Sequence, residues 1–384
     1  MTETPQYNVG FKENWYPIIY SNYISPNKHY ITKIWGEPVV AFRDSQNNAV
    51  CLQDLCPDSK TPLSRGIIKN GSIQLGQWVV STDGTCEGRD QKVKHYRTGE
   101  SQGIVFIWWG TGEINQKLPT YPEYTNPEYR LGNYIMDVDV NYIFHLSNLL
   151  DPVHYHLLHD GAIPNVTKDN YGRLKPVVID DGCSILRYKF TNPEKNPDTS
   201  FDLAFSPGLT WTLRKGKVSD GSVLVIQQGF HVPMSPNRIR VLWRMYLSKI
   251  QIPPIHYMPE WCFDLMMKVI LHNILGEDVD IIKGHFNRSV KYGAPEVNRP
   301  LTEDTLVVKL HDWEKQCLAK DGERPWFQSD LDRSQDFPIE YPPGNKTWMN
   351  RYRLCVSVAK AAALLSVAGV ATTLCSKFLF YTTI

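Results

Sequence analysis

Several signals that commonly assign a protein to a class are missing from this 384-residue sequence. Its eight cysteines are scattered, and no two are spaced as C-x-x-C, so neither a paired-thiol zinc site nor a disulfide framework is indicated. A reducing compartment is therefore expected. Basic and acidic residues nearly balance, 41 against 40, and no long run carries one sign. This balance argues against a nucleic-acid-binding surface.

Long apolar runs are also scarce. The first residues, MTETPQYNVGFKENWYP, lack both a basic segment and an apolar segment, so no secretory signal is expected. Near the other end, residues 361–376 carry no charge, but these sixteen residues fall short of the roughly 20 that a spanning helix requires. We expect residues 361–384 to form a helix that packs on the protein or lies at a membrane surface, and the alternative is a helix that spans the membrane.

What is present indicates an α+β protein with two domains and a tail. Residues 14–121 contain short alternating or apolar runs, such as EPVVAFRD and GIVFIWWG, separated by Gly, Asn, Asp and Pro. This pattern is typical of an all-β domain. Residues 122–345 contain further strand patterns, one helical stretch near residues 145–160 and a longer one near residues 257–286. They predict a sheet with helices packed on it. Residues 346–384 form the tail.

The segment HLSNLLDPVHYHLLHDG, residues 145–161, concentrates groups that bind metals. In a helix, Asn148, Asp151 and His154 would lie at i, i+3 intervals on one side, so their polar side chains would converge. Imidazole nitrogens suit Fe(II), and two of them with one carboxylate leave coordination positions open. Two of the three histidines in this segment, His154, His156 and His159, are therefore candidate iron ligands. The alternative is that these histidines are hydrogen-bonded in the core or exposed.

The carboxylate of such a site should come from another element. The predicted helix over residues 258–286 carries Glu277, Asp278 and Asp280 within an otherwise apolar pattern. A carboxylate there is costly unless it is paired or bound to a metal. The helical phase of the neighbouring isoleucines, Ile274, Ile281 and Ile282, favours Asp278 as the third ligand, with Glu277 as second choice. The alternative is a solvated acidic stripe.

These segments resemble the Rieske non-haem iron oxygenases. NLLDPVHYHLLHDG is similar to the family signature N-x-x-D-x-x-H-x-x-x-x-H, with Asn148, Asp151, His154 and His159 in the matching positions. GEDVDII resembles the later segment that gives the third ligand, and the resemblance covers residues 14–313 in order. A finer likeness is to the pheophorbide a and chlorophyllide a oxygenase branch. The resemblance implies a Rieske-like β domain, a helix-grip (START-like) catalytic domain, Fe(II), and dioxygen as co-substrate.

The first domain departs from the family pattern. A Rieske cluster is held by two cysteines and two histidines, which the family writes as C-x-H and C-x-x-H. Here Cys56 is followed by Asp58, and Leu75 and Trp78 occupy the second pair of positions. Leucine and tryptophan cannot ligate such a cluster. We therefore expect no [2Fe-2S] cluster in this chain, with the former site filled by Leu75, Trp78 and Val79.

The resemblance implies that electrons reach the iron from the cluster of a neighbouring subunit in a ring, with Asp151 bridging the two sites. Our first reading is an oxygenase subunit in a hetero-oligomer with a cluster-bearing paralogue, supplied by a ferredoxin-type reductant. The alternatives are a non-catalytic regulatory or tetrapyrrole-binding subunit, and an oxygenase reduced directly by a ferredoxin or flavoprotein. We expect a cytoplasmic protein or one associated with the thylakoid or inner membrane.

The implied substrate is a large, flat, apolar molecule such as a chlorophyll derivative. It would enter a cavity between the sheet and the helix over residues 258–285. Four aromatic residues are candidate walls of that cavity: Trp211, Phe230, Trp243 and Tyr246. The alternative is that these aromatics are ordinary core residues, because strand-borne Trp and Tyr usually pack.

Overall fold

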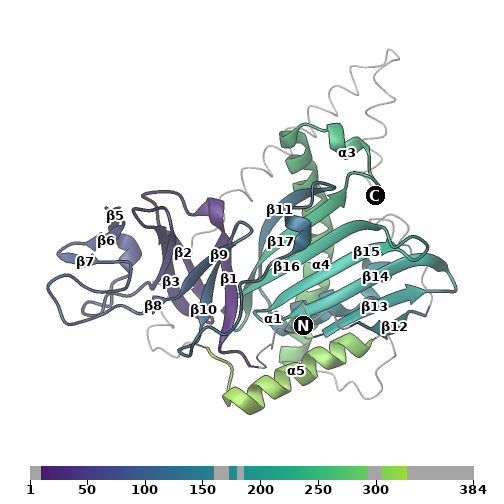
Figure 1. Ribbon diagram of the computed structural model, residues 1–384. Helices are drawn as coiled ribbons and strands as arrows, with labels where there is room; N and C mark the ends of the chain where they lie inside the picture. Colours follow the sequence, from purple (N-terminus) through teal and green to yellow (C-terminus); the bar gives the residue numbers. More distant parts are fainter. Residues whose placement is uncertain (1–9, 160–172, 180–185, 293–303, 327–384) are drawn as a thin grey trace, which may run out of the picture.

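The computed structural model describes residues 10–159, 173–179, 186–292 and 304–326, and the structural statements below concern these residues. They form a smaller domain built from three β-sheets and a larger domain built on one seven-stranded sheet (Figure 1). The predicted α+β class, with a β domain followed by an α+β domain, is confirmed.

The smaller domain contains ten strands in three antiparallel sheets, with the orders β1-β10-β9, β2-β3-β4-β8 and β5-β6-β7. β1 and β3 are buried along their whole length, because other parts of the protein cover both of their faces. The strand bounds are β1 Asn14–Tyr20, β2 Tyr30–Ile34, β3 Glu37–Arg43, β4 Ala49–Gln53, β5 Ile67–Lys69, β6 Ser72–Leu75, β7 Trp78–Val80, β8 His95–Tyr96, β9 Thr98–Ser101 and β10 Ile104–Trp109.

The larger domain is built on an antiparallel sheet with the order β11-β17-β16-β15-β14-β13-β12. Consecutive strands from β12 to β17 are neighbours, so they form a meander, and β11 joins the far edge of β17. The strand bounds are β11 Tyr129–Val138, β12 Lys175–Val178, β13 Leu186–Asn192, β14 Asn196–Ser206, β15 Thr210–Lys217, β16 Val223–Ser235 and β17 Arg238–Ser248.

The two faces of this sheet contact different parts of the protein. Successive side chains of a strand point to opposite faces, and β17 shows this division clearly. The guanidinium of Arg244 faces the smaller domain, 5.4 Å from the ring centre of Tyr20, and it donates to the carbonyl of Gln102. Trp243, on the opposite face, packs with Trp211 at a ring-centre distance of 5.0 Å. The second face is the one that the helices cover.

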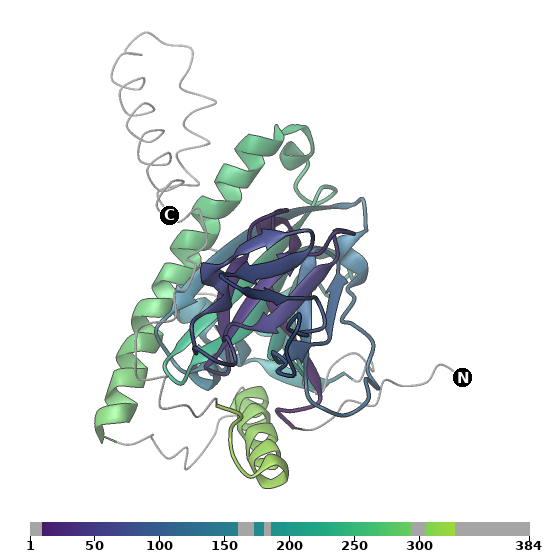
Figure 2. The same cartoon turned by 90° about the vertical axis from the view of Figure 1, so that its left-hand side faces the viewer.

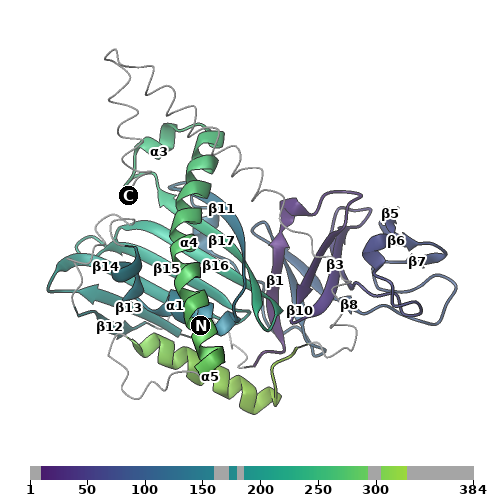
Figure 3. The same cartoon turned by 180° about the vertical axis from the view of Figure 1, so that it is seen from behind.

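The longest helix, α4 (Glu260–Tyr292), crosses this second face (Figure 3). Gly132 in β11 permits the close approach, since a Cβ there would lie 2.6 Å from Cγ of Met267. The remaining helices are α1 Tyr142–Leu150, α2 His154–Leu158, α3 Pro254–Tyr257 and α5 Thr305–Asp321. α5 lies below the sheet, as Figure 2 shows. None of the described helices is both long enough and apolar enough to cross a membrane.

Two sequence predictions about helices need correction. The single helical stretch expected near residues 145–160 is two helices, α1 and α2, separated by a break at residues 151–153. The sequence pattern also did not predict α5, whose buried residues include Leu306, Leu310 and Trp313. The apolar tail, residues 361–384, lies outside the described residues.

Candidate metal centre

The break between α1 and α2 sets the position of the first predicted ligand. α1 begins at Asn141, whose side chain accepts a hydrogen bond from the backbone N–H of Ile143 at 2.9 Å. It ends at Asp151, which is extended (φ −86°, ψ 107°). The cause is the following proline, since a residue before proline is disfavoured in the helical conformation. The chain turns there and restarts as α2 at His154.

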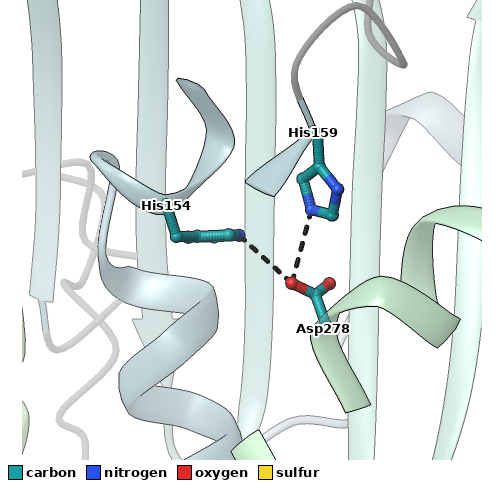
Figure 4. A group of neighbouring side chains, drawn as sticks. All are labelled: His154, His159 and Asp278. Atoms are coloured by element: carbon teal, nitrogen blue, oxygen red, sulfur yellow. Dashed lines mark ion pairs between the residues drawn. The ribbon is translucent and has the colours of Figure 1, made fainter. Parts of the chain in front are cut away.

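Three residues that are far apart in the sequence meet behind this turn. His154 begins α2, His159 directly follows it, and Asp278 comes from the middle of α4. Their ligand atoms all lie within 4.8 Å of one another, and all three residues are buried. The Oδ1 atom of Asp278 lies 3.8 Å from Nε2 of His154 and 3.3 Å from Nε2 of His159 (Figure 4). The structure thus brings together the three predicted ligands.

Hydrogen bonds fix which nitrogen of each imidazole faces the carboxylate. Nδ1 of His154 lies against the backbone carbonyl of Asp151, and Nδ1 of His159 lies 2.9 Å from Oε2 of Glu277. A carbonyl and a carboxylate can only accept, so each imidazole donates from Nδ1. In the neutral form of either ring, Nε2 then carries a lone pair. Neither Nε2 has a hydrogen-bond partner among the described residues.

This arrangement fits a bound cation. When both rings are neutral, two nitrogen lone pairs and a carboxylate oxygen converge in a buried space. Such atoms repel one another unless a positive charge, either a metal ion or a proton on His159, lies between them. Two neutral imidazoles and one carboxylate are ligands that suit Fe(II) and leave further coordination positions open. The Nδ1 contacts supply the outer hydrogen bonds that usually orient histidine ligands.

The pKa values of the group follow from burial and from its mutual contacts. Burial lowers the pKa of His154 to about 4, which keeps this imidazole neutral at pH 7. Burial raises the pKa of Asp278, but its close contacts with His159 and His154 outweigh burial and hold the pKa below its usual value. Asn148 also contributes, donating from Nδ2 to Oδ1 of Asp278 at 3.0 Å. Asp278 is therefore an anion.

The other candidates from the sequence occupy different positions. Asp151 caps α1, and its Oδ1 accepts from the backbone N–H of Val153 at 2.8 Å. His156 packs edge-on against Phe201, with 5.8 Å between ring centres, and is not part of the group. Asp280 is exposed. Ile274 is buried as expected from the helical phase, but Ile281 is exposed.

Glu277 has a function that the sequence pattern did not predict. The pattern favoured Glu277 only as a second choice of ligand, whereas its carboxylate contacts Nδ1 of His159 at 2.9 Å. This contact spans 118 positions of the chain, so local spacing carries no signal for it. The one local signal was that Glu277 directly precedes Asp278, so that two acidic residues stand together in an apolar helix.

In the smaller domain, the positions that match cluster ligands lie in and beside a separate apolar cluster. Cys56 is fully buried, while Asp58 is exposed. Leu75 and Trp78 face each other across the β6–β7 hairpin, and the guanidinium of Arg89 stacks on Trp78 at 4.1 Å. Trp78 is buried and Leu75 partly so.

One detail of the predicted filling of this site is wrong. Val80, rather than Val79, joins the apolar cluster of the smaller domain. The alternation of β7 explains the difference, because Val80 lies on the same face as Trp78 and Val79 on the opposite one.

The four candidate wall aromatics do not share a face of the large sheet. Trp211 and Trp243 lie on the face covered by helices. Phe230 contacts Phe106 and Tyr121 on the other face, at ring-centre distances of 6.4 and 5.7 Å. Tyr246 occupies the same face of β17 as Arg244. At most two of the four can therefore line a cavity between the sheet and α4.

Comparisons with known proteins agree with this architecture. A family model described as the Rieske [2Fe-2S] domain matches residues 14–98. Chlorophyllide a oxygenase of Chlamydomonas reinhardtii is 24% identical over 324 residues, which are 79% of this chain and 48% of that protein. Chlorophyllide a oxygenase of Arabidopsis thaliana is 24% identical over 347 residues, 84% of this chain and 60% of that protein. The chain thus matches about half to three fifths of these relatives.

Solved structures show the same fold. Dicamba monooxygenase bound to dicamba superimposes with a TM-score of 0.67 and 20% identity, covering 82% of this chain and 99% of that one. The NdmA protein of Pseudomonas putida CBB5 superimposes with a TM-score of 0.62 and 15% identity, covering 86% and 97%. The chain thus matches a Rieske-domain model over residues 14–98, is similar in sequence to chlorophyllide a oxygenases, and shares the fold of dicamba monooxygenase over most of its length.

Proposed function

We propose that this chain is the mononuclear iron subunit of an oxygenase that acts on a large apolar substrate, in particular a chlorophyll-type tetrapyrrole. The observation that carries the proposal is the buried group of His154, His159 and Asp278, whose ligand atoms lie within 4.8 Å of one another. The relatives named chlorophyllide a oxygenase support the substrate class. Within the proposal, residues 14–121, 122–345 and 346–384 form the Rieske-like domain, the catalytic domain and the tail.

In this proposal, His154, His159 and Asp278 hold Fe(II), which would supply the redox chemistry that activates dioxygen. Glu277 orients His159, and the Asp151 carbonyl orients His154. Asn148 holds the carboxylate of Asp278 from α1, so that one oxygen stays directed at both imidazoles.

The smaller domain, in this proposal, carries no [2Fe-2S] cluster. Only Cys56 remains of the four ligands that a Rieske centre requires, since Asp58, Leu75 and Trp78 stand in the other positions. In this proposal electrons come from a cluster-bearing paralogous subunit in a hetero-oligomeric ring, itself reduced by a ferredoxin-type protein. Asp151 is the link between the two centres, because its backbone carbonyl contacts the ligand His154.

A second candidate function is a regulatory or tetrapyrrole-binding subunit that performs no oxidation. The buried Trp78, stacked on Arg89 where the family has a cluster ligand, favours this reading. In both readings we place the protein in the cytoplasm or at a thylakoid or inner-membrane surface, with residues 361–384 as the contact to the membrane.

Metal analysis tests the proposal. Chain loaded anaerobically with Fe(II) and desalted should retain about one iron and no acid-labile sulfide, and the His154→Ala variant should lose the iron. Asp280→Asn, which removes an exposed carboxylate of the same helix, should retain it. A Rieske-type EPR signal from this chain alone would contradict the absence of a cluster. Iron retained equally by His154→Ala would contradict the site.

A partner experiment then separates the two functions. Iron-loaded chain mixed with a reduced, cluster-bearing paralogue should oxidise a chlorophyll-type substrate in a single turnover, and the His154→Ala chain should not. Equal turnover with the His154→Ala chain would mean that the paralogue alone performs the oxidation, which favours a regulatory role.

A further inference from the structure

A second pair of histidines lies beside the metal group. His145 is on α1, one helical turn before Asn148, so the two side chains lie on the same face of the helix. Asn148 binds Asp278, so this face of α1 is the one that meets the metal group. His145 is fully buried. The charge of Asp278 and the imidazole of His154 both act on it, which places it near the group.

His145 is hydrogen-bonded to a histidine of the large sheet. Its Nδ1 lies 2.9 Å from Nε2 of His231 in β16, which is also fully buried. Nδ1 of His231 lies 2.9 Å from the carbonyl oxygen of Leu209. That carbonyl also accepts the backbone N–H of His231 at 3.2 Å. Leu209 is in the left-handed region (φ 57°), a strained conformation for leucine that directs its carbonyl to His231.

The chain of contacts fixes the tautomers of both imidazoles. A carbonyl oxygen can only accept, so Nδ1 of His231 carries a hydrogen. Burial lowers the pKa of His231 well below its usual value and that of His145 to about 4, so both rings are neutral at pH 7. Nε2 of His231 then has only a lone pair, and Nδ1 of His145 must donate to it.

Nε2 of His145 is consequently a buried nitrogen with a lone pair. It has no hydrogen-bond partner among the described residues. A buried acceptor without a partner costs about 1–3 kcal/mol, so each such group calls for an explanation. The Leu209–His231–His145 chain maintains this lone pair at the cost of a strained backbone, which indicates a function beyond packing.

We propose that His145 is a positioning residue of the metal site: its Nε2 accepts a hydrogen bond from a water molecule carried by the metal that His154, His159 and Asp278 hold. His231 and the Leu209 carbonyl keep His145 in the tautomer that can accept. The inference rests on the metal function proposed above and adds a second pair of residues to it.

A direct bond from His145 to the metal is not what the geometry favours. The ligand atoms of His154, His159 and Asp278 lie within 4.8 Å of one another, and no nitrogen of His145 belongs to this group. A water molecule can link a nitrogen outside the group to the metal, because it donates one hydrogen to the acceptor and uses its oxygen for the metal. Outer hydrogen bonds of this kind support metal affinity.

Anaerobic titration with Co(II), followed by its visible absorption, tests the proposal. His145→Leu should weaken Co(II) binding by about 10–100-fold, the usual effect of losing an outer hydrogen bond at a metal site. His231→Leu should weaken it by a similar factor because it releases the tautomer of His145. The double variant should be no weaker than the weaker single variant, since the two residues act as one unit. His145→Gln, which keeps an acceptor oxygen, should recover most of the affinity.

The matched control is His311→Leu. His311 is an imidazole of α5 that contacts the same helix α1 through Ser147, at 3.3 Å, and the charged groups that act on it are Glu314, Asp312 and Lys315 rather than the metal group. The Co(II) affinity of the His311→Leu variant should equal that of the unaltered chain. Thermal unfolding of the metal-free variants separates a folding defect, which lowers the transition without metal, from a loss of the stabilisation that Co(II) adds.

The tautomer of His145 can also be measured in the unaltered protein. A variant at position 145 is then needed only to assign the signals. Two-bond ¹H–¹⁵N NMR spectra of the ring nitrogens should show Nδ1 of His145 protonated and Nε2 unprotonated, with His145→Gln identifying the signals. A protonated Nε2, or Co(II) affinity unchanged in His145→Leu, would overturn the inference. Failure of the unaltered chain to bind Co(II) at all would instead overturn the proposed metal function.

Discussion

At the scale of single residues, the metal group depends on side chains that bind no metal. His159 is the example, because Glu277 on one side fixes its tautomer and Oδ1 of Asp278 lies 3.3 Å from its Nε2 on the other. Burial alone would lower the pKa of His159, but the hydrogen bonds and charges of Asp278 and Glu277 outweigh it and raise the pKa. Both acids are consecutive residues of α4, so one turn of helix organises this ligand.

Glu277→Gln should therefore weaken metal binding while leaving the fold intact. The amide keeps the size of the side chain but loses the charge that orients Nδ1–H of His159, so we expect about a tenfold loss of Fe(II) or Co(II) affinity. The partial exposure of Glu277 keeps the effect at the lower end. Asp280→Asn, an equal charge change on the same helix, is the control. Equal affinities for the two variants would show that Glu277 has no such function.

The buried histidine His145 predicts how stability depends on pH in the metal-free protein. Burial lowers its pKa to about 4 from an ordinary value of about 6.5. The contribution of neutral His145 to the free energy of unfolding is thus fully present above pH 6.5. It is lost as the pH falls towards 4, because the unfolded chain takes up a proton that the folded chain does not.

From pH 7 to pH 5, His145→Gln should lose about 1–2 kcal/mol less unfolding free energy than the unaltered protein. Urea unfolding followed by tryptophan fluorescence at both pH values measures this difference. His256→Gln, at an exposed histidine, should show the same pH dependence as the unaltered protein. A parallel pH dependence of His145→Gln and the unaltered protein would mean that His145 remains accessible to protons when folded.

At the scale of elements, the important feature is the interruption between α1 and α2. Asp151 is extended before Pro152, and the chain turns there. Two residues near Asp278 lie on either side of this turn, Asn148 on α1 and His154 on α2. A continuous helix would place His154 roughly 9 Å beyond Asn148 along the axis of α1, since each helical residue rises about 1.5 Å. Both side chains instead reach the same carboxylate, so the ligand geometry depends on the break.

Pro152→Ala should relax this break. Asp151 would then be free to adopt the helical conformation, and we expect at least roughly tenfold weaker metal binding, as for other losses of ligand orientation. The metal-free protein should unfold at nearly the same temperature. Pro236→Ala, in the β16–β17 turn, is the control. Unaltered metal affinity of Pro152→Ala would show that Asp151 is held extended by its other contacts.

At the scale of the whole molecule, the two domains are joined by close backbone packing. Gly208, in the turn between β14 and β15, is in the left-handed region (φ 74°), and a Cβ there would lie 2.0 Å from the carbonyl oxygen of Trp15 in β1. Together with the buried Arg244, this contact fixes the smaller domain against the sheet. The position of the Rieske-like domain relative to the metal group depends on it.

Gly208→Ala should destabilise the protein by about 3 kcal/mol, because the strained conformation and the clash with β1 add. Gly221→Ala is the matched control, since its φ of 68° is similar but open space surrounds its Cβ. It should cost only about 1 kcal/mol, for the conformation alone. Denaturant unfolding measures both values. Equal costs would show that β1 moves away without resistance.

The sequence by itself determined the parts of this protein that local order encodes. Strand alternation and turn residues predicted the β domain and the sheet. The density of histidines over residues 154–159 indicated a metal site, in which the family resemblance selected His154 and His159. Asp278 was selected from the helical phase of an apolar pattern, of which Ile274 and Ile282 are buried as expected. In each case the information lies within a few residues, because helix and strand periodicities are local.

Only the tertiary structure decided which distant residues meet. The Glu277–His159 contact spans 118 positions and the His145–His231 contact spans 86, and the packing of α4 and β16 around α1 creates both. The same packing divided the four candidate aromatics between two faces of the sheet, a division that composition cannot show. The physical reason is that periodicity specifies which face of an element is apolar, whereas the partner of that face depends on how the whole chain folds.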